Sequence, residues 1–293
     1  MTIALFGNNY PEYFSKYIQH LIKKLENEHV KIIMEKKLFD FVKDKIRFQK
    51  LPEIYTNHHE LVLLSPNFLF SIGGDGTLLS AVTYVRDSDI PILGINTGRL
   101  GFISSIAADQ IEKAITDILK ENFKINKRIL LELNTSKELF SNKNFALNEV
   151  AVLKKDTSSM IKVDAFVDDE FLNTYWADGL VVSTPTGSTG YSLSCGGPII
   201  MPGTNNIIIT PNAPHNLNVR PIVISDNSVI KLKVEDRDQL ALVSLDSRSR
   251  AFESNLELII RKAEFKIKLV QPENISFTST IRNKLMWGLD KRT

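Results

Sequence analysis

Residues 68–85 read FLFSIGGDGTLLSAVTYV, and this segment indicates how the first half of the chain folds. The apolar run Phe68–Ile72 predicts a buried strand, and the apolar positions from Leu78 to Val85 have helical spacing. In a strand, glycine turn and helix of this kind, backbone N–H groups converge on a phosphate and the helix N-terminus adds favourable partial charge. The segment therefore predicts an α/β domain with an anion-binding loop.

The loop places one acid among glycines. Its residues are Gly73, Gly74, Asp75, Gly76 and Thr77. The sequence matches neither the Walker A pattern nor G-x-G-x-x-G. Phosphates repel a carboxylate unless it binds a cation or accepts a proton from an attacking hydroxyl, and phosphoryl transfer uses both roles. On these residues alone, a plain strand-to-helix turn with Asp75 as the N-cap stays open as an alternative.

Short apolar runs alternate with helical periods over residues 1–125, which predicts βαβ units around a parallel sheet. Further strands are expected at Ile3–Phe6, Val30–Met34 and Ile90–Ile95, and helices from near Pro11 and over Ile111–Leu119. Residues 35–60 are charged and less regular, and a solvated face or a mobile loop is expected there in preference to a binding patch. A second glycine turn, Gly94–Phe102, holds Arg99, for which phosphate contact and a structural role are both open.

After Lys127 the apolar period changes from helical to two, as in Ile161–Val167 and Ile230–Val234. Period two predicts strands with one buried face, so this half is expected to be an antiparallel β domain. The tail from Thr278 to Trp287 is expected to be helical. The predicted organisation is an α/β domain with the phosphate loop at 1–126, an all-β domain at 127–275, and a segment at 276–293 that returns to the first domain.

The composition is that of a globular protein without a strong long-range electrostatic field. The chain has 293 residues, with 36 Lys and Arg against 34 Asp and Glu, a net charge of +2. Such a balance does not attract nucleic acid or an anionic membrane, so any anion must be bound locally. The single cysteine forms no internal disulfide, and no run approaches the ~20 apolar residues of a membrane span, so a cytoplasmic location is expected.

A second polar segment reads DGLVVSTPTGSTGYSLSCGGP over residues 178–198. Its hydroxyls and glycines suit sugar and phosphate recognition, and Tyr191 offers a ring for a base or a nicotinamide. Upstream, Asn148 and Glu149 interrupt an otherwise apolar strand pattern. Taken alone, that pair is more typical of a surface turn.

Together these motifs resemble the NAD kinase family, and they cover most of the chain in order. They are GGDGT from Gly73, NTGRLGF from Asn96, the Asn148–Glu149 pair, ADGLVVSTPTGSTGYSLSCGGPI from Ala177, PNAPHNLNVRPIVI from Pro211 and Asp246. GGDGT is shared with diacylglycerol and sphingosine kinases and with relatives of phosphofructokinase. The long TPTGST run is specific to NAD kinases.

The resemblance implies ATP-dependent phosphorylation of NAD at its adenosine 2′-hydroxyl, in a cleft between two domains. It implies that Asp75 accepts the hydroxyl proton, while Gly73, Gly74, Gly76 and Thr77 lie near the phosphates of ATP. A divalent metal, Mg²⁺, is expected to be carried mainly by those phosphates. A homodimer or homotetramer is also implied.

For NAD, the resemblance implies contacts from both halves of the chain. Asn148 and Glu149 are expected to hold ribose hydroxyls, and Phe102 to pack near adenine. The adenine, ribose or nicotinamide end is expected to contact Asp178, Thr189, Gly190, Tyr191, Ser192, Leu193 and Ser194. Arg248 is expected to bring a cation near phosphate. Many bacterial relatives have arginine or another polar residue at the position of Trp176, some have glutamine at that of Arg248, and Gly190 stands where alanine is common.

Two other functions are compatible with parts of the sequence. A lipid kinase uses the same glycine loop, but the chain lacks a basic membrane-binding face, and a lipid head group has no use for the second polar segment. A dinucleotide-binding sensor that has lost catalysis is the alternative outside the enzymes, and the presence of Asp75 argues against it.

Overall fold

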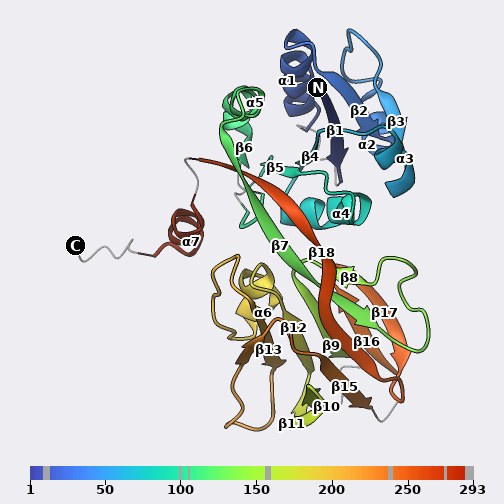
Figure 1. Cartoon of the computed structure of the whole chain (residues 1–293), viewed down its shortest axis with the longest axis vertical. Coiled ribbons are helices and arrows are strands. Elements are labelled where there is room, and N and C mark those ends of the chain that lie inside the picture. The colour runs from blue at the N-terminus through green and yellow to red at the C-terminus, as the bar shows by residue number, and fades with distance from the viewer. Residues whose placement is uncertain are drawn as a thin grey trace. The chain divides into compact units, whose positions relative to one another are not determined.

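The computed structural model describes residues 1–8, 14–98, 101–104, 106–155, 160–236, 240–273 and 276–287. The chain divides into two compact units (Figure 1). The first contains residues 1–127 and the chain from residue 267 onward, and the second contains residues 128–266. The chain passes between them within two long strands, β7 (Phe123–Asn134) and β18 (Leu258–Pro272). The domain boundaries expected from the sequence, at 126/127 and 275/276, stay predictions.

The first unit is built on a parallel sheet. Its strands are β1 (Thr2–Gly7), β2 (Lys31–Glu35), β3 (Glu53–Tyr55), β4 (Phe68–Ile72) and β5 (Ile92–Asn96), in the order β5-β4-β1-β2-β3. All of these neighbours pair in parallel, as do β5 and the short β6 (Ile106–Ala107). Near its end, β18 pairs in parallel with β5 at Leu269. The predicted α/β domain with a parallel sheet is therefore confirmed.

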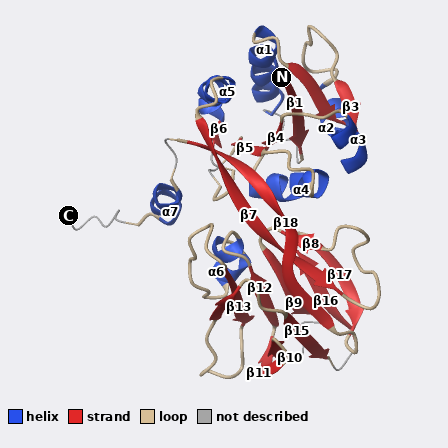
Figure 2. Cartoon of the chain, viewed as in Figure 1, coloured by secondary structure: helices blue, strands red, loops and turns tan. Residues whose placement is uncertain are grey.

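Helices are concentrated in this unit (Figure 2). They are α1 (Phe14–Asn27), α2 (Lys36–Val42), α3 (His58–Leu63), α4 (Asp75–Val85), α5 (Ile111–Leu119), α7 (Phe277–Leu285) and the 3₁₀ turn η1 (Ala108–Gln110). The apolar stripe of α1 is buried from Phe14 to Leu25, which explains why that segment is a helix. The helix start expected near Pro11 lies outside the described residues.

Residues 35–60 do not form a loop, although their basic side chains from Lys36 to Lys50 are exposed, as expected for a solvated face. This segment contains α2, β3 and the start of α3. The Glu35 side chain accepts the Leu38 N–H and caps α2, while Leu38 and Val42 are buried. Tyr55 is also buried, and its hydroxyl donates to the Leu5 carbonyl at 3.0 Å. A helix of two turns shows too few repeats among lysines to be recognised from its apolar period.

The second unit holds antiparallel ladders in two sheets. One contains β11 (Glu170–Ala177), β10 (Ile161–Val167), β15 (Ile230–Glu235) and β18, in that order, with β7 paired to β18 and β8 (Phe145–Ala146) paired to β7. The other has the order β14 (Ile222–Ser225), β13 (Asn206–Asn212), β12 (Gly179–Ser183), β9 (Glu149–Lys154), β16 (Leu240–Leu245) and β17 (Arg248–Glu253). Both contribute apolar side chains to one core. The predicted antiparallel β domain is confirmed.

Short helical turns interrupt the second unit after β12. They are η2 (Gly187–Thr189) and α6 (Tyr191–Ser194), and both lie in the hydroxyl-rich segment that the sequence singled out. Among the described residues, no helix is long and apolar enough to span a bilayer.

Candidate functional site

The GGDGT loop follows β4, which lies beside β1 in the parallel sheet. The chain order reverses between these two strands, and open α/β sheets bind ligands at such a point, at the carboxyl ends of the strands. Thr77 is buried, and its hydroxyl donates to the Asn8 carbonyl beyond the end of β1 at 3.3 Å. Thr77 thus ties the loop to the neighbouring strand.

The N-terminus of α4 is open to an anion. Its N-cap is Gly74, which has no side chain to occupy the free N–H groups of the first turn. A Cβ built on Gly74 or on Gly76 would meet nothing within 4 Å. Gly73 has φ +149°, and a Cβ there would collide with the Thr77 side chain. The glycines therefore fix the turn and leave room for a phosphate beside the helix.

Asp75 joins the two glycine turns of this unit. Its Oδ2 accepts the Phe102 N–H at 2.8 Å, and its Oδ1 accepts the N–H groups of Ile103 at 3.3 Å and Ser104 at 2.8 Å. The residue is the first of α4, following the N-cap Gly74, so the alternative of Asp75 as the N-cap is wrong. The carboxylate is half-buried and held in one orientation by these donors.

Phe102 is half-buried in the same turn, and the Lys284 ammonium of α7 lies 5.7 Å from its ring centroid. The C-terminal helix thus brings a cation to the turn that holds Asp75. Arg99, in the same turn, lies outside the described residues.

Gly101 allows Asp75 to approach this turn, which gives a testable prediction. A Cβ on Gly101 would collide with Asp75 Oδ1, whereas the nearest atom to a Cβ on Gly98 is Asn96 Oδ1 at 3.8 Å. On the expectation that Asp75 accepts the substrate proton, Gly101→Ala should displace the carboxylate and lower turnover by about 100-fold, because a shift of ~1 Å at such a group has an effect of that size. Gly98→Ala is the matched control and should stay within about 3-fold of wild type in steady-state assays. Equal activity in the two variants would show that the missing side chain of Gly101 is not needed to position the Asp75 carboxylate.

In the second unit, Asn148 lies just before β9, and Glu149 is the first residue of that strand and only 8% exposed. Asn148 Oδ1 and Glu149 Oε2 are buried without a hydrogen-bond partner in the described structure. A Cβ on Gly190 would lie 3.0 Å from Glu149 Oε2 and 3.3 Å from Asn148 Nδ2, so the pair faces that glycine. A surface turn is therefore the wrong interpretation of this pair, and its unpartnered atoms are suited to bind ligand hydroxyls.

Asp246 organises the backbone of this pair. It occupies the turn between β16 and β17 with φ +54°. Its carboxylate accepts N–H groups from Leu147 at 3.0 Å, Asn148 at 2.7 Å and Glu149 at 3.3 Å. Burial raises the pKa of Asp246, and these N–H donors and Arg248 oppose that rise. The sequence motifs included Asp246 but gave it no role, because its partners lie almost a hundred residues earlier.

The hydroxyl-rich segment contributes side chains with different surroundings. The Tyr191 hydroxyl accepts a hydrogen bond from Asn212 Nδ2 at 2.9 Å. Burial raises the pKa of Tyr191, and the charges of Cys195, Asp178 and Glu149 add to the rise. Ser192 is fully buried against the Thr210 hydroxyl at 2.9 Å, whereas Ser194 is exposed.

Three other predicted residues have protein partners. Asp178 forms an ion pair with Lys154 at 2.7 Å. Thr189 donates to the Thr186 carbonyl at 3.3 Å. The Arg248 guanidinium donates to the carbonyls of Lys143 and Phe145. Through these two hydrogen bonds, Arg248 supports the local backbone in this structure. Leu193 is half-buried in α6, and Trp176 is 51% exposed on β11.

Glu149 gives a prediction for pH dependence. Burial, and then the charge of Asp246, raise its pKa from about 4.5 to about 8. Between these values the folded state binds a proton that the unfolded chain has lost, so the stabilisation is complete below about pH 4.5 and is lost as the pH rises to about 8. We expect the free energy of unfolding to fall over this window by up to about 5 kcal/mol.

The control for this prediction is Glu149→Gln, which keeps the shape and removes the proton. Urea unfolding of both proteins at about pH 5 and about pH 8 isolates the Glu149 contribution from that of the histidines. Wild type should lose more stability than the variant between these pH values. An identical loss in both proteins would contradict the raised pKa.

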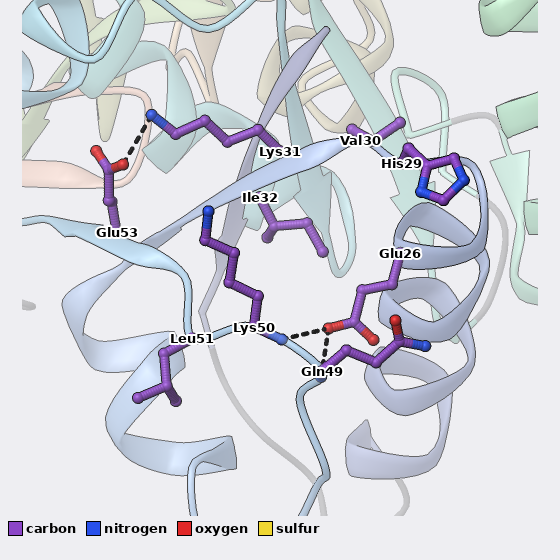
Figure 3. Close-up of a pocket in the computed structure, with 9 residues that line it drawn as sticks. All are labelled: Glu26, His29, Val30, Lys31, Ile32, Gln49, Lys50, Leu51 and Glu53. Carbon is purple, nitrogen blue, oxygen red and sulfur yellow. Dashed lines mark hydrogen bonds and ion pairs between the residues drawn. The ribbon is translucent and has the colours of Figure 1, made fainter.

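A cavity of about 380 Å³ lies elsewhere in the first unit (Figure 3). Its lining includes Lys31, which pairs with Glu53 at 2.7 Å, and Glu26, which accepts the N–H groups of Gln49 and Lys50. It is next to the first residues of β2, whereas the glycine loop follows the last residues of β4. The cavity is therefore separate from the candidate site.

Comparisons with known proteins cover both units. A model of the ATP-NAD kinase N-terminal domain matches residues 3–123, and a model of the ATP-NAD kinase C-terminal domain matches residues 147–272. The NAD kinase of Cytophaga hutchinsonii is 45% identical over 293 residues, with the whole of both chains aligned. The NAD kinase of Flavobacterium psychrophilum is 46% identical over 294 residues, again over both whole chains.

Two solved structures have the same fold. Yeast NADH kinase complexed with NADH has a TM-score of 0.87 at 24% identity, covering 99% of this chain and 89% of that chain. An NAD kinase from Archaeoglobus fulgidus in complex with ATP has a TM-score of 0.76 at 24% identity, covering 98% of this chain and 99% of that chain.

Proposed function

The chain belongs to the NAD kinase family, and we infer that it phosphorylates NAD to NADP with ATP as the phosphoryl donor. The observation that carries this inference is the match of both family domains, 3–123 and 147–272, to a chain that aligns in full with NAD kinases. Open backbone N–H groups at α4 and unpartnered polar atoms at Asn148 and Glu149 support it.

We propose that the phosphates of ATP bind at the N-terminus of α4. The absence of a capping side chain at Gly74 and the open space beside Gly74 and Gly76 support this position. A divalent cation, which we propose to be Mg²⁺, would be held mainly by the phosphate oxygens with Asp75 as the nearby carboxylate. When bound, it neutralises charge on the transferring phosphoryl group.

Asp75 is proposed to accept the proton of the attacking 2′-hydroxyl. A carboxylate has about four lone-pair sites, and the three N–H donors occupy two sites on Oδ1 and one on Oδ2. One site on Oδ2 is therefore left for the substrate hydroxyl. Because Phe102, Ile103 and Ser104 fix the carboxylate, its main contribution is to orient the hydroxyl for attack.

For NAD, we propose that Asn148 and Glu149 bind ribose hydroxyls. Asn148 Oδ1 offers an acceptor, and Glu149, with a pKa raised to about 8, is mainly protonated at neutral pH and offers a donor. The rest of NAD is proposed to contact Phe102, Asp178 and the segment 189–194. Arg248, if released from its carbonyl partners, is the proposed cation near phosphate. The family resemblance also leads us to propose a homodimer or homotetramer located in the cytoplasm.

A donor and acceptor screen of the purified protein tests this function. NAD and NADH are offered with ATP or polyphosphate in Mg²⁺, and diacylglycerol in vesicles is offered with ATP. We expect NADP from ATP and NAD and no labelled lipid. Lipid phosphorylation with NAD inert would overturn the proposal in favour of a lipid kinase.

A further inference from the structure

Arg128 carries a charge in the second unit for which the described structure provides no counter-charge. It lies on β7, and its Nη1 donates to Thr186 Oγ1 at 3.3 Å. Its Nε is buried and has no hydrogen-bond partner. Within the described ranges, no carboxylate lies within ion-pair distance of this guanidinium. The side chain therefore has one neutral contact for its positive charge.

Such an arrangement is unfavourable for the free protein. Burial lowers the pKa of Arg128 to about 10, so the group still carries its charge at neutral pH. A buried charge without a partner destabilises a fold, and proteins retain such groups mainly at functional sites. Arg261, on the paired strand β18, differs in both respects. Its side chain is half-exposed, and its charge is paired with that of Glu132 at 3.2 Å.

The partner of Arg128 belongs to the turn that supports Asn148. Thr186 is 5% exposed and lies in the STPTGST sequence after β12. In the same turn, the Thr184 N–H donates to the Asn148 carbonyl at 2.9 Å, and its hydroxyl donates to the Leu147 carbonyl at 2.7 Å. A Cβ on Gly187 would collide with the Asn148 carbonyl, so the turn packs directly against the proposed ribose site.

We propose that Arg128 binds a phosphate group of one of the two nucleotide substrates. The inference rests on the proposed function, since ATP and NAD both carry phosphates and would supply the missing negative charge. The planar guanidinium matches phosphate oxygens in geometry, and Thr186 bonds only to Nη1, so Nη2 is left to donate to a phosphate oxygen. Arg128 is thus a substrate-binding residue that neither the motifs nor the resemblance indicated.

The test uses two variants of Arg128. Arg128→Met keeps a long side chain and removes the charge, and Arg128→Lys keeps a positive charge without the planar guanidinium. Arg261→Met is the matched control. We expect Arg128→Met to raise the KM of either ATP or NAD by about 10- to 100-fold, the effect of losing a charged hydrogen bond. The substrate whose KM rises is the one whose phosphate Arg128 binds. Arg128→Lys should recover part of the loss, and Arg261→Met should stay within about 3-fold of wild type.

The melting temperature of the ligand-free protein distinguishes a substrate-binding role of Arg128 from a structural role. Because Arg128 is an uncompensated charge, the ligand-free Arg128→Met protein should melt at the wild-type temperature or higher. A lower melting temperature, with Arg128→Lys no more active than Arg128→Met, would assign the residue to the turn and overturn the proposal. KM values for both substrates within about 3-fold of wild type would overturn it as well.

A further arm distinguishes this inference from the proposed function. If the wild-type protein makes no NADP, the proposed function fails, and inorganic pyrophosphate is then used as the probe in thermal unfolding. Stabilisation of wild type and of Arg261→Met, but not of Arg128→Met, would support a phosphate site at Arg128. Equal shifts in all three proteins would overturn it.

Discussion

Replacing Asp75 by asparagine is expected to lower kcat by about 10²- to 10⁴-fold, the contribution of a positioned proton acceptor. The amide cannot take up the hydroxyl proton, and its NH₂ group would face one of the N–H donors of residues 102–104. Affinity for NAD, measured by calorimetry, should change by less than about 3-fold, because the proposed ribose contacts lie at Asn148 and Glu149.

The matched control is Asp87→Asn, just beyond the other end of α4, where the side chain is 70% exposed. That variant should keep wild-type kinetics, since surface substitutions of this kind have small effects. Full activity in Asp75→Asn would remove the proton-acceptor assignment. A large loss of NAD affinity in that variant would instead assign Asp75 to substrate binding.

Replacing Asp246 by alanine is expected to give the largest loss of stability, about 3 kcal/mol or more in the free energy of unfolding. The change removes the acceptor of three backbone N–H groups, and each unsatisfied buried group costs about 1–3 kcal/mol. Activity should fall at least about 10-fold, because Asn148 and Glu149 lose the carboxylate that orders their backbone. Urea unfolding and steady-state kinetics measure the two effects.

Asp168→Ala is the matched control for Asp246→Ala. Asp168 also has a left-handed φ, +53°, and its carboxylate accepts one N–H, from Val229 at 2.8 Å, on the surface. Its loss should cost about 1 kcal/mol and leave activity unchanged. If the two variants lose similar stability, the proposed role of Asp246 in ordering the Asn148–Glu149 pair is contradicted.

The features predictable from the sequence are those whose physics is local. Residues 68–85 contain their own strand, glycine turn and helix, and the structure has β4 and α4 there. The period-two runs at Ile161–Val167 and Ile230–Val234 likewise correspond to β10 and β15. In each case the residues that determine the element lie within it, so the pattern alone is sufficient.

The features that escaped prediction depend on distant partners. The donors to Asp75 come 27 to 29 residues later, and those to Asp246 lie 97 to 99 residues earlier. Only the tertiary fold brings these groups together. Arg128 reads in the sequence as one more basic residue after Lys127, and its buried Nε becomes visible only once Thr186 is placed beside it.

The position of the new phosphate tests the central proposal most directly. Purified protein is incubated with ATP, Mg²⁺ and NAD, and the product is examined by ³¹P NMR and with an NADP-specific dehydrogenase. We expect a phosphomonoester on the 2′-hydroxyl of the adenosine ribose and a product that the dehydrogenase reduces. A phosphate on another hydroxyl, or NAD recovered unchanged while the folded protein binds both substrates, would contradict it.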